Sequence, residues 1–127
     1  MAMGVPPTIL VVDDEPSVLL TYSMILRQSG YEVTAVASSQ EAKRALQERL
    51  FDLLICDLAL ESARSGLEVL DFARARYPAL PAILLTGYAT RDLADEADKR
   101  RVHLLFKPIE VKDLLETIAR LARARTA

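Results

Sequence analysis

Three aspartates and two other polar residues stand at points where short apolar runs of the sequence end. Asp13 and Asp14 follow one such run, Asp57 follows a second, and Thr86 and Lys107 end two more. Carboxylates brought together repel one another unless a cation joins them, and an oxygen-rich cluster of this kind suits Mg²⁺. A metal, a lysine and a hydroxyl around a carboxylate would stabilise the charge on a transferring phosphoryl group.

A carboxylate in such a setting can itself be the nucleophile and form an aspartyl phosphate, so the pattern indicates phosphoryl transfer onto an aspartate. Each residue also has a simpler explanation. The acidic pair could cap a following helix, and Thr86 and Lys107 fit ordinary loop chemistry. Four polar signals, each at the end of a different apolar run, favour a functional site over four independent coincidences.

The apolar runs alternate with longer segments of helical periodicity. The expected strands are Thr8–Val12, Glu32–Ala37, Leu53–Cys56, Ala82–Leu85 and Val102–Phe106. The expected helices are Pro16–Ser29, Ser39–Arg49 with Ser39 as its cap, Leu67–Tyr77, Thr90–Arg100 and Val111–Arg123. Five alternations predict an α/β fold with a parallel sheet and helices on both faces, whose strand ends form a ligand-binding crevice.

The bulk properties fit one soluble domain. The chain has 127 residues and a net charge of -2, which gives no sign of a general nucleic-acid or membrane binder. It has neither a secretory signal nor an apolar run near the roughly 20 residues that span a bilayer, so we expect a cytoplasmic location. The single cysteine, Cys56, allows no internal disulfide, and its side chain should be buried, pointing away from Asp57.

Together these motifs resemble the receiver family of response regulators in two-component signalling. The matching stretches are Val11-Val12-Asp13-Asp14-Glu15-Pro16, Asp57, Leu85-Thr86-Gly87-Tyr88-Ala89 and Phe106-Lys107-Pro108. The resemblance implies a flavodoxin-like, five-stranded parallel sheet of order 2-1-3-4-5. It implies a single receiver domain over residues 1–127, with a core at about 8–123, an extension at 1–7 and no effector domain within these residues.

The resemblance also implies roles for individual residues. Asp57 would be the phosphoacceptor, which takes its phosphoryl group from a phosphohistidine. Asp13, Asp14, Asp57 and the backbone carbonyl of Ala59 would hold Mg²⁺.

Two further residues would act on the phosphoryl group itself. Thr86 would hydrogen-bond a phosphoryl oxygen and shift on phosphorylation, and Lys107 would pair with the phosphoryl group or with the free phosphoacceptor. The Lys107–Pro108 bond would be cis, as X-Pro bonds tolerate.

Such a domain catalyses only its own phosphorylation and dephosphorylation, and it acts by switching partners. The resemblance implies a histidine kinase or a histidine phosphotransfer protein as donor, and a homodimer formed on phosphorylation. An effector domain or protein would bind the face of the fourth helix, fifth strand and fifth helix, where Arg91, Lys99 and Arg100 are the candidate contacts.

Four positions depart from the family pattern. Glu61 replaces the usual proline four residues after the phosphoacceptor, and Gly66 comes nine residues after it instead of eight. The loop Leu58–Ser65 is therefore one residue longer, and we expect it to be less constrained. Leu104 replaces the usual aromatic switch residue, so the coupling of site to surface must differ, and Arg101 replaces a glycine that closes the fourth helix.

Two neighbours of the site bear on dephosphorylation. Ala59 offers no side chain to orient a water, and Tyr88 could shield the phosphoryl group, so we expect slow self-dephosphorylation. Two other classes stay open. One is a pseudo-receiver that is never phosphorylated, which Leu104 and the altered loop favour slightly. The other is a flavin-binding redox protein or a phosphatase, disfavoured because Asp13-Asp14-Glu15 would repel a flavin phosphate.

Overall fold

Strands and helices alternate along the chain. The computed structural model describes residues 5–88 and 90–126. Within them the strands are β1 (Thr8–Val12), β2 (Glu32–Val36), β3 (Leu53–Asp57), β4 (Ala82–Thr86) and β5 (His103–Phe106). The helices are α1 (Pro16–Gln28), α2 (Ser39–Glu48), α3 (Ser65–Arg76), α4 (Arg91–Lys99) and α5 (Val111–Thr126).

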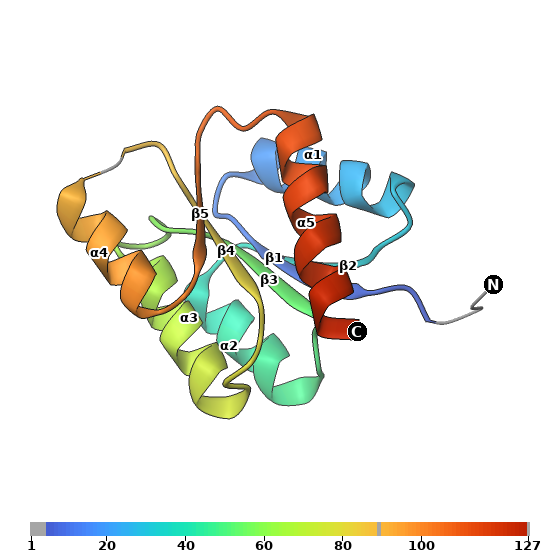
Figure 1. The fold of residues 1–127 in the computed structure, drawn as a ribbon, viewed down its shortest axis with the longest axis horizontal. Helices are drawn as coiled ribbons and strands as arrows, with labels where there is room; N and C mark the ends of the chain where they lie inside the picture. Colours follow the sequence, from blue (N-terminus) through green and yellow to red (C-terminus); the bar gives the residue numbers. More distant parts are fainter. Residues whose placement is uncertain (1–4, 89, 127) are drawn as a thin grey trace.

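All paired strands run parallel, in the order β2-β1-β3-β4-β5, which confirms the predicted fold class and strand order. Helices lie on both faces of this sheet (Figure 1). On one face α1 and α5 bury Leu26, Leu114 and Ile118 against the sheet. On the other, α2, α3 and α4 contribute Leu46, Leu70 and Leu93 to a second core cluster. The sheet is therefore covered on both sides, as an all-parallel sheet requires.

The central strands form the best-buried part of the molecule. Every residue of β3 and of β4 is buried, whereas the edge strands β2 and β5 contain no fully buried residue. Val12 pairs with Cys56 and Asp57 pairs with Leu85, so β1, β3 and β4 end almost level with one another. Because parallel strands end at the same edge, the residues that follow them are held close together on a rigid platform.

Some element boundaries differ from the sequence prediction. Ser38, not Ser39, caps α2: its Oγ accepts a hydrogen bond from the backbone N–H of Glu41 at 3.1 Å. The extended backbone of Ser38 (φ -145°, ψ 160°) is what a capping residue needs, and Ser39 is already helical. Helix α3 begins at Ser65, two residues earlier than predicted.

Parts of the sequence prediction concern residues outside those described. These are residues 1–4 of the predicted extension and Ala89 of the threonine motif. Within residues 5–88 and 90–126, no helix combines the length and the apolar character needed to cross a membrane.

Candidate functional site

The three aspartates singled out in the sequence lie together at the carboxyl edge of the sheet. Asp13 directly follows β1, Asp57 is the last residue of β3, and these two strands are neighbours. Asp13, Asp14 and Asp57 each place a carboxylate oxygen within 4.8 Å of the others. Asp13 and Asp57 are buried, at 1% and 7% exposure, while Asp14 is exposed. The cluster consists only of hard oxygen donors, the type of ligand that Mg²⁺ takes.

Lys107 reaches the same cluster from the end of β5. Its Nζ lies 3.4 Å from Oδ1 of Asp57 and 3.5 Å from Oδ2 of Asp13. The backbone N–H of Lys107 donates to the carbonyl of Thr86 at 2.7 Å, which fixes the start of the β5–α5 loop against β4. The Lys107–Pro108 peptide bond is cis, as the resemblance implied.

The charges in this cluster are not balanced. Burial raises the pKa of Asp57, Lys107 opposes that rise, and Asp13 and Asp14 add to it, so the net pKa lies above its ordinary value. Burial would lower the pKa of Lys107, but the charges of Asp57 and Asp13 and the hydrogen bonds to them raise it overall. One ammonium thus stands against three carboxylates, and the site retains negative charge that a divalent cation fits.

Thr86 ends β4 with its side chain buried beside the cluster and its hydroxyl occupied. Its Oγ1 donates to the carbonyl of Tyr88 at 2.9 Å and accepts from the N–H of Tyr88 at 3.1 Å. A pocket of about 340 Å³ opens next to this turn, between the β3–α3 and β4–α4 connections. It is lined by Leu58, Ala59, Ala63, Arg64, Thr86, Gly87, Tyr88, Thr90 and Leu93.

The β3–α3 loop is held by specific contacts, contrary to the expectation that its extra residue would leave it less constrained. Glu61 accepts from the N–H of Ser39 at 2.9 Å and from its hydroxyl at 2.6 Å, which ties the loop to the start of α2. These two bonds lower the pKa of Glu61. Ser65 Oγ accepts from the N–H groups of Leu60 and Ser62 and donates to the carbonyl of Ser62.

Gly66 allows this loop to return onto β3. Its N–H donates to the carbonyl of Leu58 at 2.7 Å. A Cβ at this position would stand 2.8 Å from Cα of Leu58 and nearer still to the carbonyl oxygen of Asp57. Only glycine fits such a close backbone approach, so the shifted glycine still serves the turn after Asp57.

Tyr22 of α1 is a neighbour of the site that the sequence did not reveal. Burial raises its pKa, and the charges of Lys107, Asp13 and Asp57 all act on it, which places its phenol near the cluster. Helical periodicity alone places Tyr22 on the apolar face of α1 and says nothing of a polar neighbour. The position of α1 beside the carboxyl edge of β1 was needed to connect it with the acidic residues.

Cys56 lies in the core, as expected from strand alternation. It is fully buried among the side chains of the α2–α3 side, and its Sγ donates to the carbonyl of Asp57 at 3.3 Å. Burial raises the pKa of this thiol well above its ordinary value, so it stays protonated. The residue therefore belongs to the packing under Asp57 and takes no part in the polar cluster.

Two departures from the family pattern have structural counterparts. Leu104 is half-buried against the α2–α3 side of the core. Arg101 adopts the left-handed conformation (φ 52°) that glycine would take without strain. Arg74 of α3 supports this helix end by donating to the carbonyls of Arg100 and Arg101.

A flavodoxin-like sheet with an acidic cluster, a lysine and a hydroxyl at its carboxyl edge defines a receiver-type domain. The sequence profile of the response regulator receiver domain matches residues 9–119. The chain therefore belongs to the response regulator receiver domain family, as the motifs indicated.

Proteins with known names or structures support this assignment. The chain is 34% identical to transcriptional regulatory protein ZraR of Escherichia coli O157:H7 over 111 residues, 87% of this chain and 25% of that protein. It is 35% identical to response regulator protein FleR of Pseudomonas aeruginosa over 115 residues, 90% of this chain and 24% of that protein. It thus spans about a quarter of the length of these curated relatives.

A solved structure of similar size also resembles the whole fold. It is the CheY-like response regulator receiver domain protein of Methanospirillum hungatei JF-1, with a TM-score of 0.90 and 28% identity. The similarity covers 96% of this chain and 98% of that one. NtrX of Brucella abortus, solved in complex with ATP, matches with a TM-score of 0.86 and 27% identity over 96% of this chain and 28% of its own length.

Proposed function

We propose that this chain is a phospho-accepting receiver domain in which Asp57 accepts a phosphoryl group from a phosphohistidine. The observation that carries the proposal is the position of Asp57, whose carboxylate lies within 4.8 Å of two other carboxylates and 3.4 Å from the ammonium of Lys107. A carboxylate that is buried, yet reachable from the carboxyl edge of the sheet, is suited to nucleophilic attack.

In the transfer, an Oδ atom of Asp57 forms a bond to phosphorus while the P–N bond to the donor imidazole breaks. The electron pair of that bond stays on the imidazole nitrogen, which becomes a neutral base. Lys107, now between Asp13 and Asp57, would then also bind a phosphoryl oxygen. Fixed positive charge at a developing anion stabilises the transition state without reorganisation.

The residues proposed to hold Mg²⁺ are Asp13, Asp14, Asp57 and the backbone carbonyl of Ala59. The three carboxylates fit because they are close, acidic and incompletely neutralised by Lys107. A bound Mg²⁺ would supply charge neutralisation for the carboxylates and for the phosphoryl oxygens.

Thr86 is proposed to bind a phosphoryl oxygen through its hydroxyl. To do so it must stop donating to the carbonyl of Tyr88. Ala59 offers no side chain to orient a water, and Tyr88 could shield the phosphoryl group, so we expect slow self-dephosphorylation; a lifetime of only seconds would contradict this.

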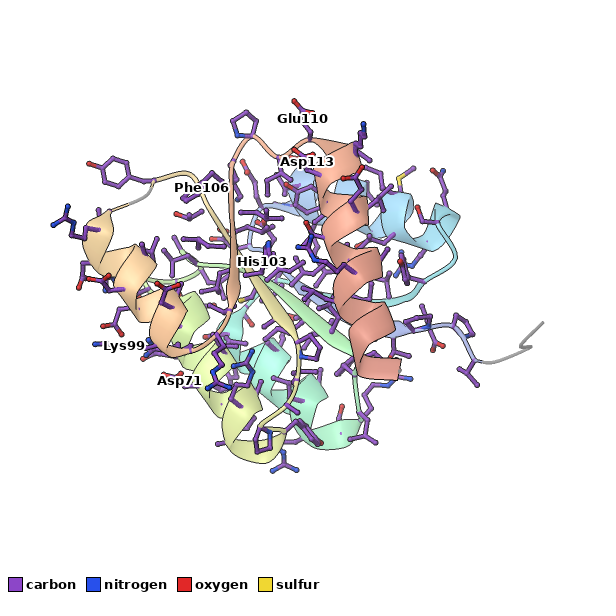
Figure 2. The ribbon with its side chains drawn as sticks, viewed as in Figure 1. Asp71, Lys99, His103, Phe106, Glu110 and Asp113 are labelled. Atoms are coloured by element: carbon purple, nitrogen blue, oxygen red, sulfur yellow. The ribbon has the colours of Figure 1, made fainter. Side chains whose placement is uncertain are left out.

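The partners are proposed from the same role. The donor would be a histidine kinase or a histidine phosphotransfer protein, and residues of about 8–123 would act as one receiver unit, alone or within a longer protein. The output face is proposed to be α4, β5 and α5. Figure 2 shows His103 and Phe106 on β5 between α4 and α5, with Asp113 on α5 and Lys99 on α4. Phe106, the last residue of β5, is 50% exposed, and Val111 at the start of α5 is 44% exposed, so this face offers apolar surface to a partner.

The charged residues expected on the output face differ in their availability. Arg100 binds both carboxylate oxygens of Asp71, at 2.8 and 3.1 Å, and Glu96 at 2.6 Å. Its charge is therefore used within the domain, where it joins α3 to the end of α4. Arg91 and Lys99 are exposed and are the better candidates for contact with a partner or with a second phosphorylated copy.

Mass spectrometry of the intact protein after incubation with Mg²⁺ and acetyl phosphate tests the proposal. We expect a gain of one phosphoryl group in the wild type and none in Asp57→Asn. Asp95→Asn is the matched control, because Asp95 is an exposed aspartate on α4 and should leave the gain unchanged. No phosphoryl gain in the wild type, with acetyl phosphate or with a panel of phosphorylated histidine kinases, would favour the pseudo-receiver instead.

A further inference from the structure

The turn after β4 is held together by the same hydroxyl that the phosphoryl group would need. Thr86 Oγ1 bonds to both backbone groups of Tyr88, the N–H at 3.1 Å and the carbonyl at 2.9 Å. A hydroxyl has one proton to donate. When that proton is given to a phosphoryl oxygen, the bond to the carbonyl of Tyr88 is lost. The conformation of the β4–α4 turn is therefore linked to the occupancy of Asp57.

The aromatic side chain of Tyr88 is largely exposed to water, which is unfavourable for an apolar ring. It is 78% exposed, the most exposed aromatic among the described residues. Yet it stands at the rim of a pocket of about 340 Å³ whose walls are mainly apolar, with Leu58, Ala63 and Leu93 among them. Moving an aromatic ring from water into an apolar pocket is favourable, so the ring of Tyr88 is a suitable occupant for this pocket.

The pocket lies between the starts of two helices. Arg64, the residue directly before α3, and Asp92, in the first turn of α4, form an ion pair at 2.6 Å that spans the two helix starts. The small side chains of Ala59 and Ala63 leave the space between them open. Gly87, which joins Thr86 to Tyr88, has open space on the side where a Cβ would be.

Leu104 cannot serve as the moving side chain. It has no aromatic ring, and it is packed against the core cluster that contains Leu84 and Leu93. Tyr88 is the aromatic residue that lines the pocket beside Thr86.

We propose that Tyr88 is the moving aromatic of this domain: capture of the Thr86 hydroxyl by the phosphoryl group on Asp57 releases Tyr88, and its ring enters the pocket between α3 and α4. This inference rests on the proposed function, because the phosphoryl group is what removes the hydroxyl. In the unphosphorylated state the ring is displayed on the surface, and in the phosphorylated state it is withdrawn. The surface beside α4 then differs between the two states by one aromatic side chain.

Fluorine NMR of protein labelled with 3-fluorotyrosine tests this movement with the native ring in place. The chain has four tyrosines, and Tyr88→Phe identifies the line of Tyr88. Spectra are recorded in Mg²⁺ with and without acetyl phosphate, in the presence of a neutral gadolinium chelate that broadens exposed lines. We expect phosphorylation to shift the Tyr88 line and to remove most of its broadening. Intact mass on the same samples reports the phosphoryl group.

Two variants distinguish entry into the pocket from a general change. Ala63→Leu fills the pocket, so the Tyr88 line should stay broadened after phosphorylation, whereas Ala94→Leu on the exposed face of α4 should behave like the wild type. Thr86→Val removes the hydroxyl and should make the Tyr88 line the same with and without acetyl phosphate. A phosphoryl gain with an unchanged Tyr88 line would overturn this inference alone. Absence of any phosphoryl gain would overturn the proposed function and this inference with it.

Discussion

Replacement of Gly66 by alanine tests how tightly the loop after Asp57 is built. The new Cβ would lie 2.8 Å from Cα of Leu58 and closer than any ordinary contact to the carbonyl oxygen of Asp57. Both obstacles are backbone atoms. They cannot swing aside, because Leu58 donates to the carbonyl of Leu85 at 2.8 Å and accepts from Gly66 at 2.7 Å. Relief of the clash must therefore displace the end of β3.

The expected cost follows from these contacts. Overpacking of a well-ordered site costs about 1–3 kcal/mol, and a backbone obstacle puts Gly66→Ala near the upper end. Alanine is the better helix former by up to about 1 kcal/mol, but Gly66 is only the second residue of α3, so the compensation is partial. The net loss is about 2 kcal/mol, which lowers the thermal midpoint by roughly 8 °C in a domain of this size.

Urea unfolding followed by circular dichroism measures this loss, with Gly87→Ala as the control. A Cβ on Gly87 meets nothing within 4 Å, and its φ is not positive, so that variant should stay within about 0.5 kcal/mol of the wild type. Gly66→Ala should also gain its phosphoryl group more slowly, because the displaced backbone carries Asp57. Equal unfolding midpoints for the two variants would refute the claim that the shifted glycine is required by a close approach.

Three further outcomes are expected. In EDTA, Asp57→Asn should be more stable than the wild type by about 1–2 kcal/mol. The reason is that the Asp57 carboxylate is repelled by two carboxylates within 4.8 Å and attracted by one ammonium. Thermal melts should show that this difference disappears when excess Mg²⁺ is added. Burial, with the charge of Arg120, lowers the pKa of His103, so its neutral form stabilises the fold above its unfolded pKa of about 6.5, and that stability is lost as pH falls below it. His103→Gln should accordingly lose less stability than the wild type between pH 7.5 and 5.5, and parallel melting curves would argue against it. Arg101→Gly should raise the unfolding free energy by about 0.5–1 kcal/mol, because it removes the strain of a side chain at φ 52°, and an unchanged urea midpoint would contradict this.

The fold was predictable from the sequence because its signals are local and repeated. Strands buried on both faces must be apolar nearly throughout, and β3 and β4 are, so their runs stood out from the helical segments around them. The grouping of Asp13, Asp14 and Asp57 followed from a rule of parallel sheets, that the carboxyl ends of neighbouring strands share one edge. Neither prediction required knowledge of the loop conformations.

What the sequence did not predict depends on loop geometry. Ser38 and Ser39 are equally good capping residues in composition, and only the backbone conformation decides between them. The bond between Glu61 and Ser39 joins positions 22 residues apart, so the absence of the usual proline suggested a loose loop where the structure has a tied one. The partner of the Thr86 hydroxyl was likewise hidden, because it is set by the turn that Gly87 and Tyr88 make.

The site combines an acidic cluster that cannot move with a hydroxyl that can. Asp13 and Asp57 lie at the ends of β1 and β3, in which every residue except Thr8 is buried, so their mutual repulsion cannot be relieved by a shift of the backbone. It can be relieved only by binding positive charge, which Lys107 begins and does not complete. Thr86, by contrast, holds a surface turn by two hydrogen bonds, and an acceptor at Asp57 would compete for the one that its hydroxyl donates to the carbonyl of Tyr88. Binding of a group at the acidic cluster can therefore drive a rearrangement of the turn after β4. Coupling between sites is typically worth about 1–3 kcal/mol, which is close to the free energy of the hydrogen bonds that the Thr86 hydroxyl would exchange.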